Sequence, residues 1–325
     1  MENDRDCILC LTELNRDRMK ITFVVLLGLV LSATGGEPTA HWQQNSNSLA
    51  LLDGKRVIWQ FNFAANEGKP YFHPLSLNNG TVVTALRPPD HPWHRGLWWS
   101  WKLINGRNYW EEDKKTGQSE GLTEITKISM ETNDNFSARI QMDLAYHPPK
   151  QPNLMTEKRT LTISAPDKAG NYTIDWDCSF TAGSEDLKLD RTPPHDWAGG
   201  YAGLSLRFSK SAMGWTFTSS EGTGGSKNIY GKSARWVDLS GRDGGVVIFD
   251  NPANPRHPTW WYPNDTMPWL TPAFLFHEAY TLKAEKTLCL RYRVLVHSEN
   301  TDVKFLEQQW QTYTNLSTTL KTHNP

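Results

Sequence analysis

The sequence predicts an all-β protein, folded as a large antiparallel β-sandwich that ends in one C-terminal helix. From residue 37 onward, short apolar or alternating runs are separated by turn residues, and the runs are rich in β-branched and aromatic side chains. The chain has 23 Gly and 19 Pro, which suit many turns, and 15 Trp, which suit an aromatic binding site. Residues 37–325 show no linker, internal repeat or shift in composition, so we expect a single domain.

The expected strands follow one another at the spacing typical of a sandwich. In chain order they cover residues 48–52, 56–61, 81–86, 96–103, 108–112, 137–146, 157–164, 172–181, 203–208, 245–250, 273–276 and 287–297. Residues 301–314 are the one good helix. Thr301 suits its N-cap, and Val303, Leu306 and Trp310 fall on one helical face.

A β-hairpin is expected around Asn105-Gly106, a pair that favours the type I′ turn. The register pairs Ile104 with Arg107, Trp101 with Trp110 and Ser100 with Glu111. Strand alternation then gives two faces. The core face carries Arg95, Leu97, Trp99, Trp101, Leu103, Trp110 and Glu112. The other face, the floor of an open cleft, carries Gly96, Trp98, Ser100, Lys102, Tyr109 and Glu111.

The same register limits what Glu111 can do. Its partner Ser100 is six residues from His94, roughly 20 Å along a straight strand at ~3.3 Å per residue. One site around both side chains is therefore not expected. Glu111 either binds a ligand further along the groove or is a solvated hairpin carboxylate.

The loop before this strand concentrates the chemistry of the chain. Asp90-His-Pro-Trp-His94 is stiffened by Pro88, Pro89 and Pro92. His91 and His94 can hold one divalent cation with Asp90 beside them, act as acid and base near neutral pH, or hydrogen-bond loop carbonyls. Arg95 either binds a substrate carboxylate or pairs with Asp90.

A second loop, residues 250–262, echoes the first. It is rich in Pro and carries Arg256 beside His257, followed by Trp260 and Trp261. This similarity favours two loops that converge on one site, with His257 as a third imidazole. The alternative is an ordinary structured loop. Further candidates, each more often structural when taken alone, are His73, Tyr201 and the pair His277-Glu278.

The N-terminus predicts export. A charged start at Met19-Lys20, the apolar run 21–31 and the small residues 32–36 form a signal-peptide pattern, and the run is too short to span a membrane. Residues 1–18 then precede the true start as a mis-assigned extension. They contain Cys7 and Cys10, so the mature chain keeps Cys178 and Cys289, which could form one disulfide. We expect a periplasmic or secreted protein without stable membrane insertion.

Charge and missing motifs exclude several classes. A formal net charge of -1 without basic runs argues against nucleic acid as a partner. No G-x-S-x-G elbow, P-loop or dinucleotide-type glycine pattern is present, which argues against nucleotide chemistry.

Five segments resemble one known family. They are residues 70–75 (PYFHPL), 89–98 (PDHPWHRGLW), 104–106 with 109–111, 199–204 (GGYAGL) and 254–259 (NPRHPT). They resemble the secreted bacterial family catalogued as "methane oxygenase PmoA", which differs from the multi-helix membrane subunit of that name. The resemblance implies a sandwich similar to galactose-mutarotase-like sugar enzymes, and no established reaction. Relatives commonly carry a second His where this chain has Trp93, which favours stacking there over an extra metal ligand.

These observations predict an exported carbohydrate-active enzyme. It acts on a glycoside or a sugar acid, by hydrolysis or by β-elimination. His91, His94 and His257 with Asp90 supply acid–base groups, or the three histidines hold a divalent metal. Substrate contacts are assigned to Arg95, Arg256, Trp98, Trp260, Tyr201, Glu111 and His73, with Trp93 as a further stacking candidate. The alternatives are a non-catalytic glycan-binding module and a metal-dependent oxidase, as the family name suggests.

Overall fold

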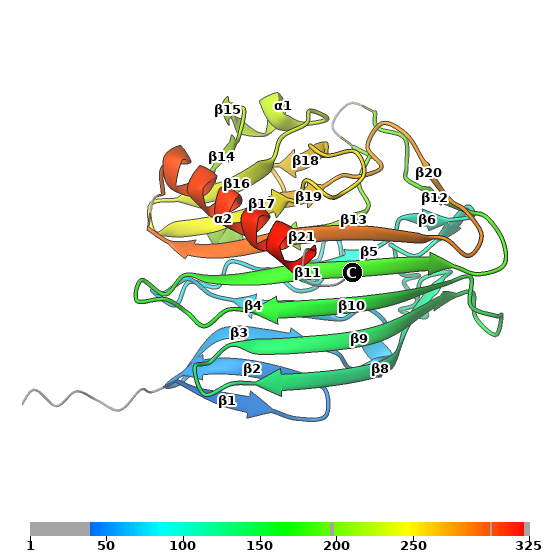
Figure 1. Cartoon of the computed structure of the whole chain (residues 1–325), viewed down its shortest axis with the longest axis horizontal. Coiled ribbons are helices and arrows are strands. Elements are labelled where there is room, and N and C mark those ends of the chain that lie inside the picture. The colour runs from blue at the N-terminus through cyan, green and yellow to red at the C-terminus, as the bar shows by residue number, and fades with distance from the viewer. Residues whose placement is uncertain (1–39, 196–197, 300, 322–325) are drawn as a thin grey trace, which may run out of the picture. The chain divides into compact units, whose positions relative to one another are not determined.

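Two large antiparallel sheets enclose the core, and one long helix follows the last strand (Figure 1). The computed structural model describes residues 40–195, 198–299 and 301–321. The extension and the signal peptide expected for residues 1–18 and 19–36 lie outside these residues. Every ladder between the named strands is antiparallel, so the predicted all-β sandwich with a C-terminal helix is confirmed.

The first sheet has eight strands in the order β1-β2-β3-β4-β5-β13-β19-β18. They are β1 (Ala40–Gln44), β2 (Ser48–Asp53), β3 (Arg56–Asn62), β4 (Tyr71–Leu75), β5 (Leu97–Ser100), β13 (Gly203–Arg207), β19 (Trp269–Pro272) and β18 (Trp261–Asn264). Since β13 and β19 are inserted beside β5, distant loops of the chain reach the same part of this sheet.

The second sheet has nine strands in the order β15-β14-β16-β17-β21-β11-β10-β9-β8. They are β15 (Gly222–Thr223), β14 (Thr216–Ser219), β16 (Trp236–Gly241), β17 (Gly244–Asp250), β21 (Thr287–Ser298), β11 (Tyr172–Ala182), β10 (Met155–Ile163), β9 (Ala138–His147) and β8 (Leu122–Thr132). A four-stranded sheet joins β20 (Tyr280–Leu282), β12 (Leu187–Asp190), β6 (Leu103–Ile104) and β7 (Arg107–Asn108).

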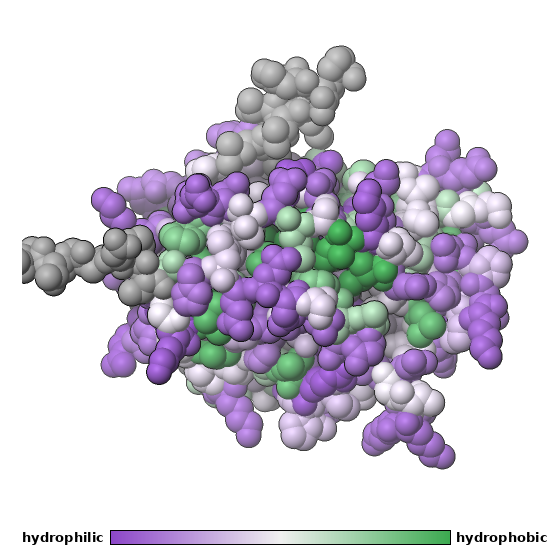
Figure 2. Space-filling model, turned by 90° about the horizontal axis from the view of Figure 1, so that it is seen from below, coloured by the Kyte–Doolittle hydropathy of each residue, from purple (hydrophilic) through white to green (hydrophobic). Residues whose placement is uncertain are grey.

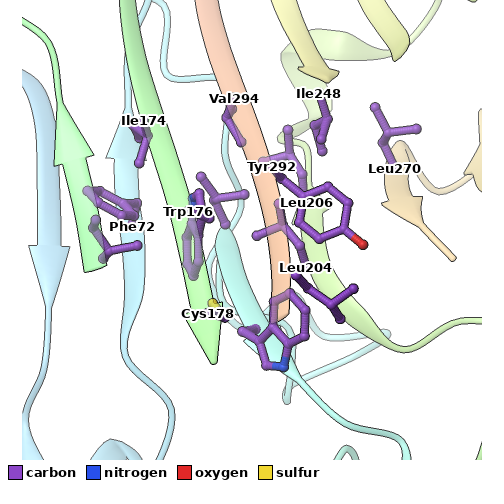
Figure 3. Close-up of a cluster of buried hydrophobic side chains, with 14 of the residues drawn as sticks. Phe72, Ile174, Trp176, Cys178, Leu204, Leu206, Ile248, Leu270, Tyr292 and Val294 are labelled. Carbon is purple, nitrogen blue, oxygen red and sulfur yellow. The ribbon is translucent and has the colours of Figure 1, made fainter. Parts of the chain in front are cut away.

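The core lies between the facing sides of the two large sheets. Phe72 of β4 contacts Trp176 of β11 with ring centroids 6.1 Å apart, and Trp99 of β5 contacts Phe180 at 5.1 Å. Figure 3 shows the middle of this layer, where side chains of β4, β13 and β19 meet those of β11, β17 and β21. Alternation along each strand directs every second side chain into this layer, which is the pattern that the sequence shows.

Trp42 of the edge strand β1 packs on Phe136, in the turn between β8 and β9, with ring centroids 6.3 Å apart. Seen from below, this side of the molecule is mixed, with apolar patches separated by hydrophilic side chains (Figure 2). The long strand β8 was not expected from the sequence. It is an edge strand whose side chains are mostly exposed and polar, so its hydrophobic alternation is too weak to detect.

The C-terminal helix α2 (Val303–Lys321) packs on the outer side of β16, β17 and β21 (Figure 1). Its Leu306 and Tyr313 are buried there beside Trp310, whereas Val303 is 48% exposed, so the predicted face is correct only in part. Asp302 caps the helix, since Phe305 N donates to Asp302 Oδ1 at 2.7 Å; the predicted cap was Thr301. Short helices are α1 (Gly225–Ile229), η1 (Ala65–Glu67) and η2 (Lys210–Ala212). None of the described helices is long and apolar enough to cross a membrane.

Two predicted strands are not formed, and a third, residues 108–112, is formed only at Asn108. Residues 81–86 make only isolated bridges, at Val82, Thr84 and Leu86, and residues 273–276 form a turn. The hairpin starts as predicted, with Ile104 opposite Arg107 and positive φ at Asn105 and Gly106. It ends after two pairs.

The side chain of Asn108 ends the hairpin. Asn108 Oδ1 accepts hydrogen bonds from Trp110 N at 2.8 Å and Glu111 N at 3.2 Å, which turns the chain out of the ladder. The two following side chains therefore exchange their predicted faces. Tyr109 lies in the core between the sheets, and Trp110 lies on the outer side of the first sheet.

Cys178 and Cys289 do not form the disulfide that the sequence left possible. Cys178 lies opposite Leu290 and Cys289 lies opposite Ser179, on the neighbouring strands β11 and β21. Adjacent positions on a strand point to opposite faces, so Cys178 is buried in the core while Cys289 lies on the other side of the sheet. Both thiols are free.

The loop Asp90–His94, called the histidine loop below, leads through Gly96 into β5. We expect Gly96→Ala to lower the free energy of unfolding by about 2–4 kcal/mol. Its φ is +65°, and a Cβ would lie 2.4 Å from the carbonyl oxygen of Phe72. Gly106→Ala is the matched control, because its φ is +77° and nothing lies within 4 Å of an added Cβ. Urea unfolding measures both variants, and equal losses would contradict the steric argument.

Candidate functional site

The outer side of the eight-stranded sheet carries a second, smaller hydrophobic group beside polar side chains. We call it the aromatic cluster; its buried members are Tyr71, Trp98, Trp110, Tyr262, Trp269, Ala273 and Phe276. Trp98 lies on the face that the sequence predicts, opposite Ser205 of β13 and Tyr71 of β4. It is only 1% exposed, however, so it is covered and does not form an open floor. Trp93, Tyr201 and Trp260 border the cluster and are half-buried.

The histidine loop is fixed onto this face by its own backbone. His91 N donates to Pro88 O and His94 N donates to His91 O, both at 3.0 Å, and Arg87 N donates to His94 O at 2.8 Å. These successive turns, together with the prolines, leave the loop few alternatives. They place the rings of His91 and His94 in a stack, with centroids 4.6 Å apart and planes 19° apart.

Asp90 links His91 to Arg207. Asp90 Oδ2 accepts hydrogen bonds from His91 Nδ1 at 2.8 Å and from Arg207 Nη2 at 2.7 Å. Partial burial works against ionisation, but the bonds from His91 and Arg207 outweigh it and hold the pKa of Asp90 below its ordinary value. An ionised Asp90 keeps the proton of neutral His91 on Nδ1. The other ring nitrogen, Nε2, then carries a lone pair and contacts no partner among the residues that the structure describes.

His94 is uncharged and enclosed. Its ring lies 4.3 Å from that of Trp269 and 5.2 Å from that of Trp98. Burial, joined by the positive charge of nearby Arg207, lowers the pKa of His94 far below its ordinary value of 6.5. Its Nδ1 is buried and has no hydrogen-bond partner within the described part of the chain.

The buried neutral His94 makes stability depend on pH. In the unfolded chain it takes up a proton near pH 6.5, whereas in the folded protein it does not. Its depressed pKa therefore contributes stability above pH 6.5, and this contribution is lost as the pH falls. Between pH 7 and pH 5 the free energy of unfolding of the wild type should drop by roughly 2 kcal/mol more than that of His94→Gln. Urea unfolding at the two pH values measures the difference, and parallel losses would contradict a neutral His94.

Arg95 belongs to a buried ion network and is not available for substrate, contrary to both predicted roles. It is 1% exposed and pairs with Glu112 and, at 3.3 Å, with Glu67. Arg87 binds the same two carboxylates, at 3.0 Å and 2.8 Å. Asp90 pairs with Arg207 instead, and this arginine was not singled out in the sequence.

Lys69 connects this network to the aromatic cluster. Its Nζ donates to Trp110 O at 2.7 Å and to Ser119 Oγ at 3.2 Å and lies 3.6 Å from Glu112. Burial, with the nearby positive charge of Arg95, lowers the pKa of Lys69 to about 7. Lys69 also lines a cavity of about 350 Å³ toward β8, and none of the predicted site residues lines that cavity.

Glu111 lies on the same face but is bound to protein groups. It forms an ion pair with Lys102, which is 7% exposed, and accepts a hydrogen bond from Asn108 Nδ2 at 2.7 Å. Lys102 Nζ lies 5.6 Å from the ring centroid of Tyr201, which in turn packs on Trp110 at 5.0 Å. Burial, reinforced by Glu111, raises the pKa of Tyr201 above its ordinary value. These groups border the aromatic cluster, and their contacts with a ligand stay a prediction.

His73 is on β4, close to the histidine loop. Its Nδ1 hydrogen-bonds Thr84 Oγ1 at 2.9 Å, and burial lowers its pKa below the ordinary value. Thr84 in turn forms an isolated β-bridge with Phe208, which follows Arg207 in the chain. His73 is therefore held on the same part of the sheet as Arg207. A substrate contact by His73 stays a prediction.

His257 does not join the other histidines. Its Nδ1 contacts Asp250 at 2.7 Å, and its ring stacks on Trp310 of α2. It thus packs near the outer side of the nine-stranded sheet, and the expected convergence of His257 with His91 and His94 is wrong. Among the described residues, no group of three or more His, Cys, Asp or Glu side chains could hold a metal ion, so the predicted three-histidine metal site is not assembled.

Arg256 fixes its own loop to residues 274–279 and does not present its guanidinium to an anionic substrate group. Its guanidinium donates to the carbonyl oxygens of Phe274, Glu278 and Ala279 at 2.8–3.1 Å and pairs with the Glu278 carboxylate. Trp260 lies beside it, 4.8 Å from the ring of His277, at the border of the aromatic cluster.

Comparisons with known proteins add little about the site. Two solved structures that the chain resembles are an alpha-galactosidase from Lactobacillus brevis (10% identity, TM-score 0.39, 80% of this chain and 39% of that one) and a polysaccharide lyase (11% identity, TM-score 0.27, 81% and 33%). The chain thus spans about two fifths and one third of their lengths. No curated protein matches the sequence. Residues 48–311 match the model described as a family of unknown function, DUF6807.

Proposed function

The chain belongs to the DUF6807 family, and we propose that it is a carbohydrate-active enzyme in which His91 transfers a proton at a bound sugar. The observation that carries this proposal is the link Arg207–Asp90–His91. An imidazole whose Nδ1–H is held by an ionised carboxylate presents Nε2 as a base, and the same nitrogen can later return the proton as an acid.

The exposed fractions of the side chains support His91, rather than His94, as the histidine that transfers the proton. Its side chain is 35% exposed and that of Asp90 is 47% exposed, whereas His94 is 2% exposed. His94 instead forms the wall against which the His91 ring stacks. We therefore assign acid–base chemistry to His91, orientation to Asp90 and a supporting position to His94.

Half-buried aromatic side chains beside His91 suit a sugar. Trp93 lies 5.4 Å from the ring of His91, and Tyr201 borders the aromatic cluster on the side of Trp110. Aromatic rings with one exposed side bind the apolar faces of sugar rings, while polar groups at their edges take the hydroxyl groups. In this proposal Trp93 keeps the stacking role that the sequence suggested for it, and Tyr201 takes the role assigned to Trp98.

A screen of glycan fragments tests the proposal. Hydrolysis and β-elimination both release new reducing ends, and elimination alone adds an unsaturated sugar that absorbs in the ultraviolet. Turnover of at least one fragment by either route is expected. Glycan binding without cleavage of any fragment would contradict the proposal and support a binding module.

The N-terminal segment supports action outside the cytoplasm. The charged start, apolar run and small residues of 19–36 suit export, and complex glycans are met outside the cell. N-terminal sequencing of the protein expressed with its full leader should find the first residue near position 37. Retention of the leader on the purified protein would contradict export by this route.

A further inference from the structure

Arg207 holds two hydrogen-bond donors for which the described protein offers no acceptor. Only Nη2 is used, by Asp90, while Nε and Nη1 are buried and have no partner among the residues that the structure describes. The side chain is 9% exposed. Buried donors of a charged group are rarely left unsatisfied, since each one costs roughly 1–3 kcal/mol. Such a group is typical of a site that a ligand completes.

A second unsatisfied group lies in the same place. His94 Nδ1 is also buried without a partner in the described part of the chain, and the positive charge of Arg207 contributes to the lowered pKa of His94. The backbone explains this proximity, because Arg207 N donates to Gly96 O at 2.8 Å, two residues after His94. Arg207 lies opposite Trp269 of the aromatic cluster in the ladder of β13 and β19. Three unused polar atoms therefore gather beside His91.

We infer that Arg207 and His94 bind a sugar acid, with the carboxylate of the sugar on the Arg207 guanidinium. The inference rests on the proposed function and names its substrate class. Nε–H and Nη1–H lie on different edges of the planar guanidinium, so one carboxylate does not satisfy both. A sugar acid supplies a carboxylate for one edge and hydroxyl groups for the other edge and for His94 Nδ1, because a hydroxyl can accept from or donate to this nitrogen.

The other arginines of the predicted site do not offer this chemistry. The guanidinium of Arg95 is neutralised by Glu112 and Glu67, and that of Arg256 is taken by three carbonyl oxygens and Glu278. Among the residues that the structure describes, Arg207 has a single carboxylate partner, Asp90, whose side chain is about half exposed.

A substrate carboxylate bound to Arg207 favours β-elimination over hydrolysis. Pairing with the guanidinium stabilises the negative charge that develops when the carbon next to the carboxylate loses its proton. His91 Nε2 takes that proton, and the C–H electron pair forms a carbon–carbon double bond with the neighbouring carbon. The bond from that neighbour to the glycosidic oxygen breaks, and the oxygen leaves with the electron pair and takes a proton from water. No oxidant or reductant is needed.

Binding of matched monosaccharides tests the inference. D-glucuronate and D-galacturonate are compared with D-glucose and D-galactose by calorimetry, since each pair differs only in the carboxylate. The wild type should bind at least one acid ten-fold or more tightly than its neutral parent. Arg207→Gln should abolish this preference. Arg207→Lys keeps the charge and can keep the Asp90 pair but loses the planar donors, so it should weaken acid binding five-fold or more.

The exposed Arg242, which pairs with the neighbouring Asp243, provides the control variant Arg242→Gln, and thermal melting verifies that each variant is folded. Equal binding of acid and neutral sugar by the wild type, or a preference that survives in both folded Arg207 variants, would overturn the inference. So would failure of the wild type to bind either acid, which would leave buried water as the partner of these donors.

The two proposals fail separately. Arg207-dependent binding of an acid without turnover of any glycan would refute the enzyme and keep the sugar-acid site. Cleavage of a neutral glycan at the same rate in wild type and Arg207→Lys would keep the enzyme and refute the sugar-acid site.

Discussion

Replacing His91 by glutamine is expected to lower kcat/KM on the glycan identified by the fragment screen by about 10²–10⁴-fold, the contribution of a positioned acid–base group. Glutamine can keep a hydrogen bond to Asp90 but cannot take or return a proton at the position of Nε2. The loss should therefore appear in kcat, with little change in KM. Initial rates over a range of substrate concentrations separate the two constants.

His147→Gln is the matched control for this prediction. His147 also contacts a carboxylate, Glu124 at 3.2 Å, but it ends β9 of the other sheet. That variant should retain the wild-type rate. Asp90→Asn should also reduce kcat, because the amide no longer selects the Nδ1–H form of His91. A His91→Gln enzyme with wild-type kcat would rule out proton transfer by this residue, even if the sugar still binds nearby.

The largest loss of stability is expected from Glu157→Gln in the core. Glu157 and Arg159 are neighbours on one face of β10, and both side chains are fully buried. Arg159 donates to both carboxylate oxygens, at 2.6 Å and 2.8 Å, and Tyr146 Oη donates to one of them at 2.5 Å. Removing the negative charge leaves a buried guanidinium without compensation, which costs about 3–5 kcal/mol.

Urea unfolding measures this loss, and a second variant tests its cause. Glu157→Gln combined with Arg159→Met removes both charges and should regain much of the stability, because no buried charge is left unpaired. Asp177→Asn on the adjoining strand β11 breaks the exposed pair with Arg291 of β21 and should change stability little. If the double variant loses as much free energy of unfolding as the two single variants together, packing and not charge explains the loss.

The main features of the fold follow from local sequence patterns, and the errors have local causes. The inward side chains of β5, Leu97 and Trp99, were predicted correctly because alternation alone decides them. The hairpin turn at Asn105-Gly106 was correct because its backbone requires such residues. The register after Asn108 was wrong because a side-chain cap competes with the ladder, and propensity does not show which one forms.

The candidate site was less predictable, because its contacts join distant parts of the chain. The loop Asp90–His94 was identified by its composition. Its partner Arg207 is 117 residues away from Asp90, in a strand that reads as ordinary core, and only the order of strands in the sheet brings them together. His257 was misplaced for the opposite reason. A repeated Pro–Arg–His–Trp pattern indicates similar loops, but it carries no information on where each loop is attached.

The aromatic cluster also gives the protein a built-in optical signal. Trp98, Trp110 and Trp269 have ring centroids 5.5–5.7 Å apart and are fixed at defined angles. Indoles held so close together couple their electronic transitions, which produces strong circular dichroism in the near ultraviolet that disappears when tertiary packing is lost. His94 is in van der Waals range of this group, with its ring 4.3 Å from that of Trp269. A ligand that contacts the histidine loop beside these indoles can thus be followed spectroscopically, without a label and without turnover.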